Sequence, residues 1–252
     1  MALLGVHIII QARMNSTRLP GKVLKPFVGE YTFLQWIVER LRTSEVAEHV
    51  IVATSTASED DMIASLCVQS EYDYYRGSEE DVLSRYWSAS QRFNSKIIVR
   101  ATSDNPFIDV LEMDRLVRVL VEEGLAYANN HVGGLPVGAG TECFTQAALE
   151  RASIEAHDAF DREHVTPYFR RNSASFPQKN IDALLKHPLA PSVRLTLDTP
   201  EDYDFFISLG RSLRVDGLQN QPSTTDVLNH LAKHPELVAI NNHVLQKTFP
   251  KL

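Results

Sequence analysis

Strand-like and helix-like segments alternate along the first half of the chain, and this alternation restricts the fold more than any other feature of the sequence. Residues 6–10 (VHIII) form a β-branched run, as in a strand covered by helices on both faces. Residues 31–43 carry apolar side chains at helical spacings, and strands are expected again at 49–55 and 96–101. The pattern predicts an α/β fold with a doubly wound, mainly parallel sheet. The other elements expected in this half lie at 58–67, 72–75, 78–93 and 112–124.

The rhythm changes in the second half of the chain. Residues 124–144 hold two short strand-like pieces around a glycine-rich turn, which predicts a small β excursion from the sheet and an arm for a second copy of the chain. A helix is expected at 158–171, where Pro167 starts, kinks or interrupts it. A last strand at 194–198 should lead into a helix opened by Thr199.

Length and composition exclude several classes of protein. A chain of 252 residues can bury a sizeable core, so we expect a single domain over 1–252. Its net charge of -7 argues against binding to nucleic acid or to acidic membranes, because both need a broad basic surface. No apolar run is long enough for a membrane helix, so no membrane insertion is expected. Cys67 and Cys143 lack metal-ligand spacing, which favours a reducing cytoplasmic location.

Three cations follow the first expected strand within a polar loop, which is expected to face solvent. In residues 8–22 (IIIQARMNSTRLPGK), small hydroxyl residues and a glycine separate Arg13, Arg18 and Lys22. Such a loop can surround a polyphosphate with guanidinium groups, an ammonium group and backbone N–H groups. Neither GxxxxGK[ST] nor GxGxxG occurs here, and solvated surface cations are the alternative interpretation. Ligand-binding loops of a parallel sheet follow the carboxyl ends of strands, which selects 12–26, 53–58 and 101–109.

Two aspartates follow expected strands and are candidates for binding a metal ion. Asp104 ends the stretch ATSD, and Asp198 ends LTLD. A hard dication such as Mg²⁺ takes one or two carboxylates together with phosphate oxygens and water, which this pair could supply. Each aspartate could instead cap the next helix, an alternative that weighs most for Asp198. Asp109 is expected to be a helix cap.

Five segments of the chain resemble, in the same order, those of the cytidylyltransferases that make CMP-activated acidic sugars. The nearest resemblance is to the spore-coat polysaccharide biosynthesis cytidylyltransferase group, with the 3-deoxy-manno-octulosonate and acylneuraminate cytidylyltransferases as relatives. It implies a Rossmann-like fold of the nucleotide-diphospho-sugar transferase type and a Mg²⁺ cofactor. The segments are 8–24, 75–89, 97–109, 161–169 and 195–205.

The resemblance also implies roles for individual residues. Lys22, Arg18 and Asp104 are the expected catalytic residues, and Asp104 and Asp198 the expected metal ligands. Ser78 could equally be the cap of the helix that follows it. The residues expected to bind the nucleotide are Gln11, Ala12, Arg13, Arg18, Lys22, Gly77, Ser78, Thr102 and Ser103.

The acceptor side is less complete. The resemblance places Glu142 and His164 at the acceptor, although a lone helical histidine is more often structural. Where the family shows Gly-x-Asp-x-Glu, this chain has Thr141 before Glu142 and Gly140 in place of the middle aspartate. The missing charge puts a standard acidic sugar in doubt. Asn15 stands where glycine is commoner, which a loop should tolerate.

These inferences predict a Mg²⁺-dependent cytidylyltransferase that transfers CMP from CTP to a small acidic acceptor and releases pyrophosphate. One alternative keeps the fold and the metal but uses another nucleoside triphosphate or a phosphorylated acceptor that is not a sugar. Another is a family member that binds nucleotides without turnover. By analogy with dimeric relatives, we expect a homodimer.

Overall fold

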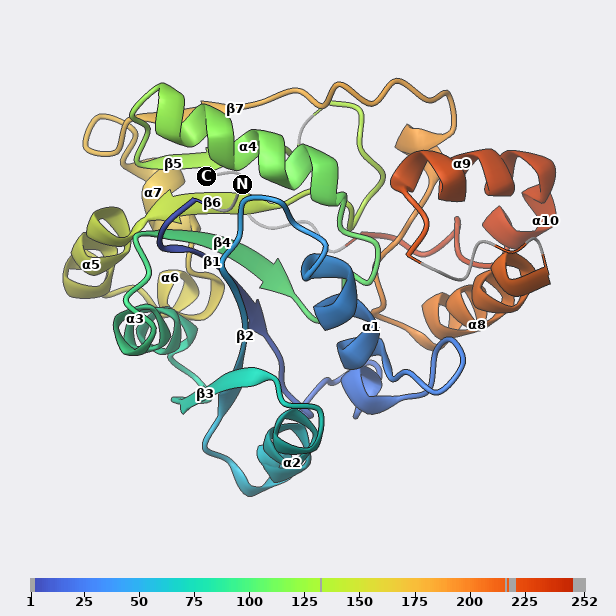
Figure 1. Ribbon diagram of the computed structural model, residues 1–252, viewed down its shortest axis with the longest axis horizontal. Coiled ribbons are helices and arrows are strands. Elements are labelled where there is room, and N and C mark those ends of the chain that lie inside the picture. Colours follow the sequence, from blue (N-terminus) through green and yellow to red (C-terminus); the bar gives the residue numbers. More distant parts are fainter. Residues whose placement is uncertain (1–2, 132, 216, 218–220, 247–252) are drawn as a thin grey trace.

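A seven-stranded sheet forms the centre of the molecule (Figure 1). The computed structural model describes residues 3–131, 133–215, 217 and 221–246. The strands lie in the order β3-β2-β1-β4-β6-β5-β7, and β3, β2, β1 and β4 run parallel. Strand β6 is antiparallel to β4 and β5, while β7 is parallel to β5. The strands are β1 Val6–Gln11, β2 His49–Ser55, β3 Asp73–Gly77, β4 Ile97–Thr102, β5 Tyr127–Asn129, β6 Glu142–Thr145 and β7 Gln178–Asn180.

Helices cover both faces of this sheet, which confirms the predicted doubly wound α/β fold (Figure 1). On one face, α1, α2 and α4 contribute to a core with inward side chains of β1 such as Ile8 and Ile10. On the other, α3, α5 and α7 pack with Ile9 and Phe144. The helices are α1 Phe33–Leu41, α2 Asp61–Gln69, α3 Val82–Arg92, α4 Val110–Glu122, α5 Gln146–Glu155, α6 Ala159–His164, α7 Pro167–Arg171, α8 Pro200–Val215, α9 Thr224–Lys233 and α10 Pro235–Val238, with short 3₁₀ helices at Lys22–Leu24, Ser58–Asp60 and Ala190–Ser192.

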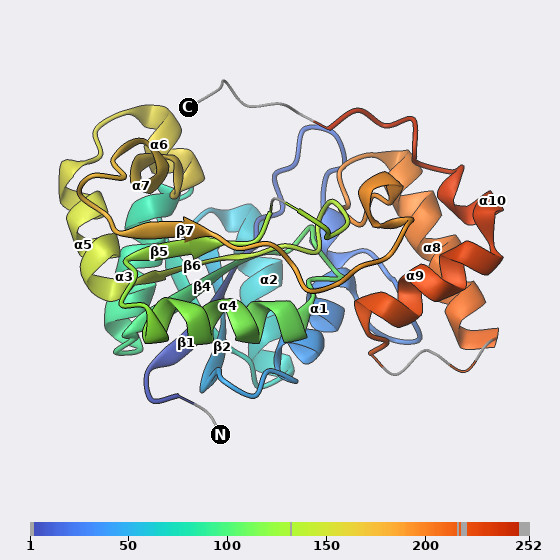
Figure 2. The ribbon, with the colours of Figure 1, turned by 90° about the horizontal axis from the view of Figure 1, so that it is seen from above.

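The C-terminal helices pack beside the sheet (Figure 2). Helices α8 and α9 form a third apolar cluster with Phe27, which directly follows the loop at 12–26, Trp36 of α1 and Phe107. This packing draws the chain after residue 193 toward the loops that follow β1 and β4. Within the described ranges, no helix has both the length and the apolar content needed to cross a membrane.

The structure corrects the sequence interpretation of two β segments. The strand pieces expected to leave the sheet at 124–144 are β5 and β6, and both hydrogen-bond within it. The strand expected at 194–198 is only an extended segment, joined to the turn before β6 by a bridge between Val137 and Arg194. The backbone of this segment hydrogen-bonds to loops on two sides, so it does not pair with a strand of the sheet.

The helix expected at 158–171 is two helices. Val165 adopts a φ of 70° between α6 and α7, a conformation that interrupts a right-handed helix. Pro167 then occupies the first turn of α7, where its missing N–H costs no hydrogen bond. Of the three roles considered for Pro167, the structure therefore shows the first.

Candidate active site

The loops after β1 and β4 leave neighbouring strands at the point where the strand order reverses direction. In open α/β sheets this is where ligands bind. The loop after β1 ends at Gly21, whose φ of 66° favours glycine, and Lys22 follows it in a 3₁₀ turn. The turn carries the Lys22 side chain back toward the end of β4.

Lys22 lies between the two predicted metal ligands. Its Nζ donates to Asp104 Oδ2 at 3.0 Å and to Asp198 Oδ1 at 3.2 Å. It also donates to the Leu197 carbonyl at 2.6 Å. The residue is 8% exposed, so the expectation that it faces solvent on an open loop is wrong. The ammonium group joins segments far apart in the sequence.

Two arginines complete the charges around Asp198. Arg18 Nη2 lies 3.0 Å from Asp198 Oδ1, and Arg194 Nη2 donates to Asp198 Oδ2 at 2.9 Å. Arg194 is itself held by Asp202 through Nε at 2.9 Å. We call these residues, Lys22, Asp104, Asp198, Arg18, Arg194 and Asp202, the Lys22 cluster. It contains three cations and three carboxylates.

The helix-cap alternatives for the two aspartates are not what the structure shows. Thr199 precedes α8, and it exchanges hydrogen bonds with Asp202: the Thr199 N–H donates to the carboxylate, and the Asp202 N–H donates to Oγ1. Asp198 lies one residue earlier, and its carboxylate faces the cations. Asp104 is followed by a turn, and α4 is capped by Asp109, as predicted.

The electrostatics keep Asp104 ionised. Burial alone would raise the pKa of this carboxyl, but the Lys22 charge and hydrogen bonds from Thr102 and Lys22 outweigh it, so the pKa lies below its ordinary value. Its side chain is 30% exposed, and that of Asp198 is 13% exposed. Both carboxylates therefore remain accessible to a bound ligand.

The donor set fits a Mg²⁺ ion that is shared with a substrate. Asp104 and Asp198 each reach the same ammonium nitrogen, so oxygens of both can approach one cation. Among the described residues, no group of three or more His, Cys, Asp or Glu side chains could hold a metal ion alone. Two carboxylates completed by phosphate oxygens and water match the usual coordination of Mg²⁺.

The other residues expected to bind the nucleotide surround the ends of β1, β3 and β4. Gln11 and Thr102 are register partners, and the Ser103 N–H donates to the Gln11 carbonyl. Ala12 is buried, and its N–H donates to Ala53. Arg13 lies on the rim, with Nη2 3.9 Å from the Glu163 carboxylate of α6.

The end of β3 has little room for side chains. A Cβ at Gly77 would lie 3.0 Å from the Tyr75 ring and 3.1 Å from Arg85. Ser78 does not cap α3: that position belongs to Asp81, whose N–H is accepted by the Ser78 hydroxyl at 3.0 Å. The capping alternative for Ser78 is therefore wrong, while its nucleotide contact stays a prediction.

Glu142 lies in a second charged group beside the first. Its Oε2 accepts from Arg100 at 3.0 Å and from Thr166 at 3.1 Å, and its Oε1 accepts from Tyr127. Arg100 also donates to Gln11 Oε1 at 3.1 Å. We call Glu142, Arg100, Tyr127, Thr166 and Gln11 the Glu142 cluster. Burial would raise the pKa of Glu142, but His131, Arg100 and Arg170 lower it well below its ordinary value.

Glu142 is therefore placed differently from a residue that faces a substrate. It is 2% exposed, and both carboxylate oxygens already accept hydrogen bonds. His164, the other expected acceptor residue, is the last residue of α6, and its ring lies edge-on to Phe160 at 4.5 Å between centroids.

Comparison with known proteins decides the family. The chain matches the sequence profile of the family described as "Cytidylyltransferase" over residues 7–229. The chain belongs to the cytidylyltransferase family. The match includes both charged clusters.

Three relatives of this cytidylyltransferase confirm the resemblance found in the sequence. The spore coat polysaccharide biosynthesis protein SpsF of Bacillus subtilis (strain 168) is 32% identical over 90% of this chain and 94% of that protein. The structure of a cytidylyltransferase from Leptospira borgpetersenii serovar Hardjo-bovis matches with a TM-score of 0.85 and 31% identity, covering 97% of this chain and 100% of that one. The 3-deoxy-manno-octulosonate cytidylyltransferase of Psychrobacter cryohalolentis is 30% identical over 46% of this chain and 44% of that protein.

Arg194, Asp202 and Arg100 are members of the two clusters that sequence analysis missed. Polar Arg194, Thr196 and Asp198 alternate with leucines, which could have indicated one polar face shared by Arg194 and Asp198. Arg100 is a charge within the apolar run IIVRA, a position that requires a partner when buried. Asp202 stands three residues after Thr199, the spacing of a capping box.

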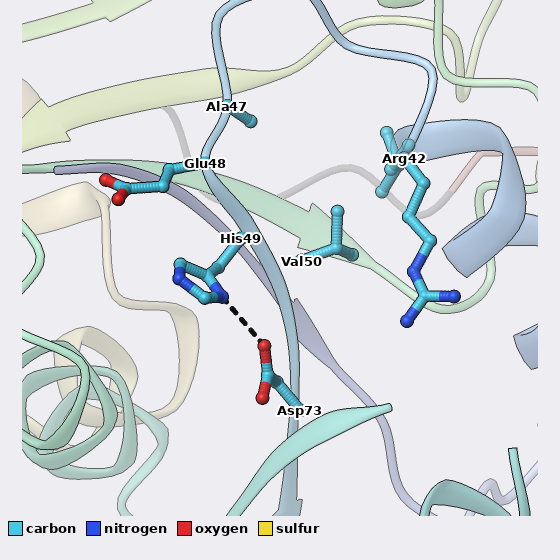
Figure 3. A pocket seen from close by; sticks show the side chains of 7 residues that line it. Arg42, Ala47, Glu48, His49, Val50 and Asp73 are labelled. Atoms are coloured by element: carbon cyan, nitrogen blue, oxygen red, sulfur yellow. Dashed lines mark hydrogen bonds and ion pairs between the residues drawn. The ribbon is translucent and has the colours of Figure 1, made fainter. Parts of the chain in front are cut away.

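Two hollows of the cytidylyltransferase lie away from the Lys22 cluster. One of about 610 Å³ lies between Phe27 and residues of α8 such as Arg211. The other, of about 210 Å³, is lined by Glu48, His49 and Asp73, near the start of β2 and β3 (Figure 3). There His49 Nδ1 lies 2.8 Å from the Asp73 carboxylate. Parallel sheets bind ligands at the other end of β2 and β3, so the second hollow is not the candidate active site. The first is lined by no residue of the Lys22 cluster.

Proposed function

We propose that this cytidylyltransferase transfers CMP from CTP to an acidic sugar or a related surface-polysaccharide precursor and releases pyrophosphate. One observation carries the proposal: Lys22 lies between Asp104 and Asp198, with Arg18 beside them, where the loops after β1 and β4 leave the sheet. The similarity to a spore coat polysaccharide protein and to a 3-deoxy-manno-octulosonate cytidylyltransferase supports the class of acceptor.

The proposed reaction is a displacement at phosphorus. An acceptor oxygen forms a bond to the α-phosphorus of CTP, and the bond from that phosphorus to the bridging oxygen breaks. Pyrophosphate leaves with the electron pair, and the proton of the acceptor hydroxyl passes to the solvent. Because no covalent enzyme intermediate is needed, the protein acts by alignment and charge neutralisation.

Lys22 and Arg18 would hold the triphosphate. Both cations pair with Asp198, and phosphate oxygens can replace a carboxylate as their partner. Arg194 stays with the buried Asp202, which fixes the position of Asp198. Asp104 and Asp198 would hold Mg²⁺, which when bound neutralises phosphate charge.

Pyrophosphate release tests the proposal. The protein would be incubated with Mg²⁺, each nucleoside triphosphate in turn and a panel of acidic sugars and phosphorylated metabolites. We expect release with CTP and an acidic sugar, and none after chelation of the metal. Release only with a purine nucleotide, or only with a phosphorylated acceptor, would contradict the proposal.

Two further parts of the proposal concern the oligomeric state of the enzyme and its location in the cell. We propose a homodimer that uses the turn between β5 and β6, where Val137 is 40% exposed. Sedimentation at micromolar concentration should then show a pair of subunits, and a single-chain species would count against it. The cytoplasmic location also stays a prediction, which fractionation of cells would check.

A further inference from the structure

The amide of Gln11 has only one orientation available to it. Gln11 Oε1 accepts from Arg100 Nη2 at 3.1 Å. A guanidinium group has donors and no acceptor, so the atom of Gln11 that faces Arg100 must be the oxygen. The amide nitrogen, Nε2, therefore points away from Arg100. Within the described part of the chain, Nε2 donates no hydrogen bond to the protein.

Arg100 cannot easily release this amide, because Glu142 holds it. Glu142 accepts from Arg100, Thr166 and Tyr127, and the last two residues are fully buried. The side chain of Arg100 is 16% exposed and that of Glu142 is 3% exposed. Separating a buried ion pair leaves an uncompensated charge, which is strongly unfavourable. The pair therefore acts as a fixed support behind Gln11.

An amide locked in this way distinguishes the two pyrimidine bases. Cytosine presents an acceptor at N3, where uracil presents an N3–H donor, whereas O2 is an acceptor in both bases. A free glutamine amide can rotate by half a turn and offer its oxygen to uracil. The locked amide of Gln11 can offer only N–H groups, so facing the N3–H of uracil it would leave two buried donors without an acceptor, which is costly.

We propose that the Glu142 cluster fixes Gln11 so that Nε2 donates to N3 of cytosine, which makes this residue a determinant of the preference for CTP over UTP. This inference rests on the proposed function. It makes Glu142 a positioning residue that acts through Arg100, in place of the acceptor contact expected from the sequence.

The position of Gln11 favours the base over the phosphates as its ligand. The basic loop begins directly after Gln11 and ends at Lys22, where three cations gather. Anionic phosphates are bound most strongly by those charged donors. A neutral base edge can be bound by a neutral donor, and the amide directly before the loop supplies one.

The test is calorimetric titration of folded protein with CTP and with UTP in Mg²⁺ buffer. Gln11→Glu retains an oxygen for Arg100 but replaces the free donor by an acceptor. We expect CTP to bind about tenfold or more weakly, and UTP more tightly, so that the preference falls or inverts. Arg100→Met should release the amide and reduce the preference mainly by tighter binding of UTP.

Arg118→Met is the matched control, because Arg118 pairs with Glu45 on the exposed surface at 3.3 Å. It should leave both affinities unchanged. If Arg100→Met does not fold, Gln11→Glu decides, since Gln11 is only partly buried. A folded Gln11→Glu protein with the wild-type preference for CTP overturns this inference alone. A wild-type protein that binds neither nucleotide overturns the proposed function and the inference with it.

Discussion

Two charged clusters flank the basic loop, and they differ in how their carboxylates are shared. In the Lys22 cluster, Asp198 has three cationic partners, and Asp104 and Asp198 share one of them. In the Glu142 cluster, one buried carboxylate is surrounded by donors, and its cation has one further, neutral partner. Shared, partly exposed partners can be exchanged for a ligand, whereas a saturated buried pair fixes geometry. The same residue types thus serve exchange in one place and support in the other.

The largest expected effect is on turnover, and it comes from a substitution in the Lys22 cluster. Asp104→Asn keeps the shape of the side chain but removes a charge that we propose holds Mg²⁺, so turnover should fall about a thousandfold, while the melting temperature changes little. Asp109→Asn is the matched control, because asparagine caps α4 about as well as aspartate. Pyrophosphate release measures both variants. Wild-type turnover of Asp104→Asn would remove Asp104 from the metal site.

Glu142→Ala should show the opposite pattern, with stability as the main loss. It leaves the Arg100 guanidinium buried without its ion-pair partner, which should cost about 3–5 kcal/mol of unfolding free energy. Urea unfolding checks this value. Glu45→Ala breaks the exposed pair with Arg118 and should cost about 1 kcal/mol or less. Equal losses in the two variants would show that the Glu142 cluster is no support.

Arg18→Ala should weaken CTP binding with little loss of stability, because Asp198 keeps Lys22 and Arg194 as partners. The lost charge-assisted contact should cost about 1.5–3 kcal/mol of binding free energy. Calorimetric titration with CTP measures it. Arg92→Ala, at the exposed end of α3, is the control. Unchanged affinity would return Arg18 to a solvated surface residue.

The smallest expected effect lies away from both clusters, near the start of β1. Burial and the neighbouring His49 lower the pKa of His7 below 6.5, while Glu48 and Asp73 oppose this shift. The unfolded chain therefore binds more protons, so His7 makes the protein less stable as pH falls below about 6.5. In His7→Gln the loss of unfolding free energy between pH 7.5 and 5.5 should be smaller. An identical pH dependence would contradict the assignment.

The sequence predicted the half of the sheet in which each strand and each helix can be recognised from the spacing of its own apolar residues. Strands β1 to β4 and the helices between them follow from that pattern. The polar strand β7, QKN, has no hydrophobic signal, because its ladder with β5 depends only on tertiary placement. Lys22 was expected in solvent because its burial depends on a segment distant in the sequence.

The missed strand has the same physical origin. Residues 194–198 alternate as a strand should, yet their hydrogen bonds go to Val137 and to Asp104 in loops. Local alternation predicts an extended backbone but cannot say which backbone lies beside it. Arg194 was missed for that reason, although its spacing from Asp198 was visible.

The backbone bond from the Leu197 N–H to the Asp104 carbonyl, at 2.7 Å, has a consequence for biosynthesis. It closes a long loop, and the entropy of that closure is lost before the contact forms. A nascent chain that has released its residues up to Asp104 from the ribosome still lacks Asp198, and Lys22 then has only one of its two carboxylates. Nucleotide binding should therefore begin only late in translation, after the segment before α8 has emerged.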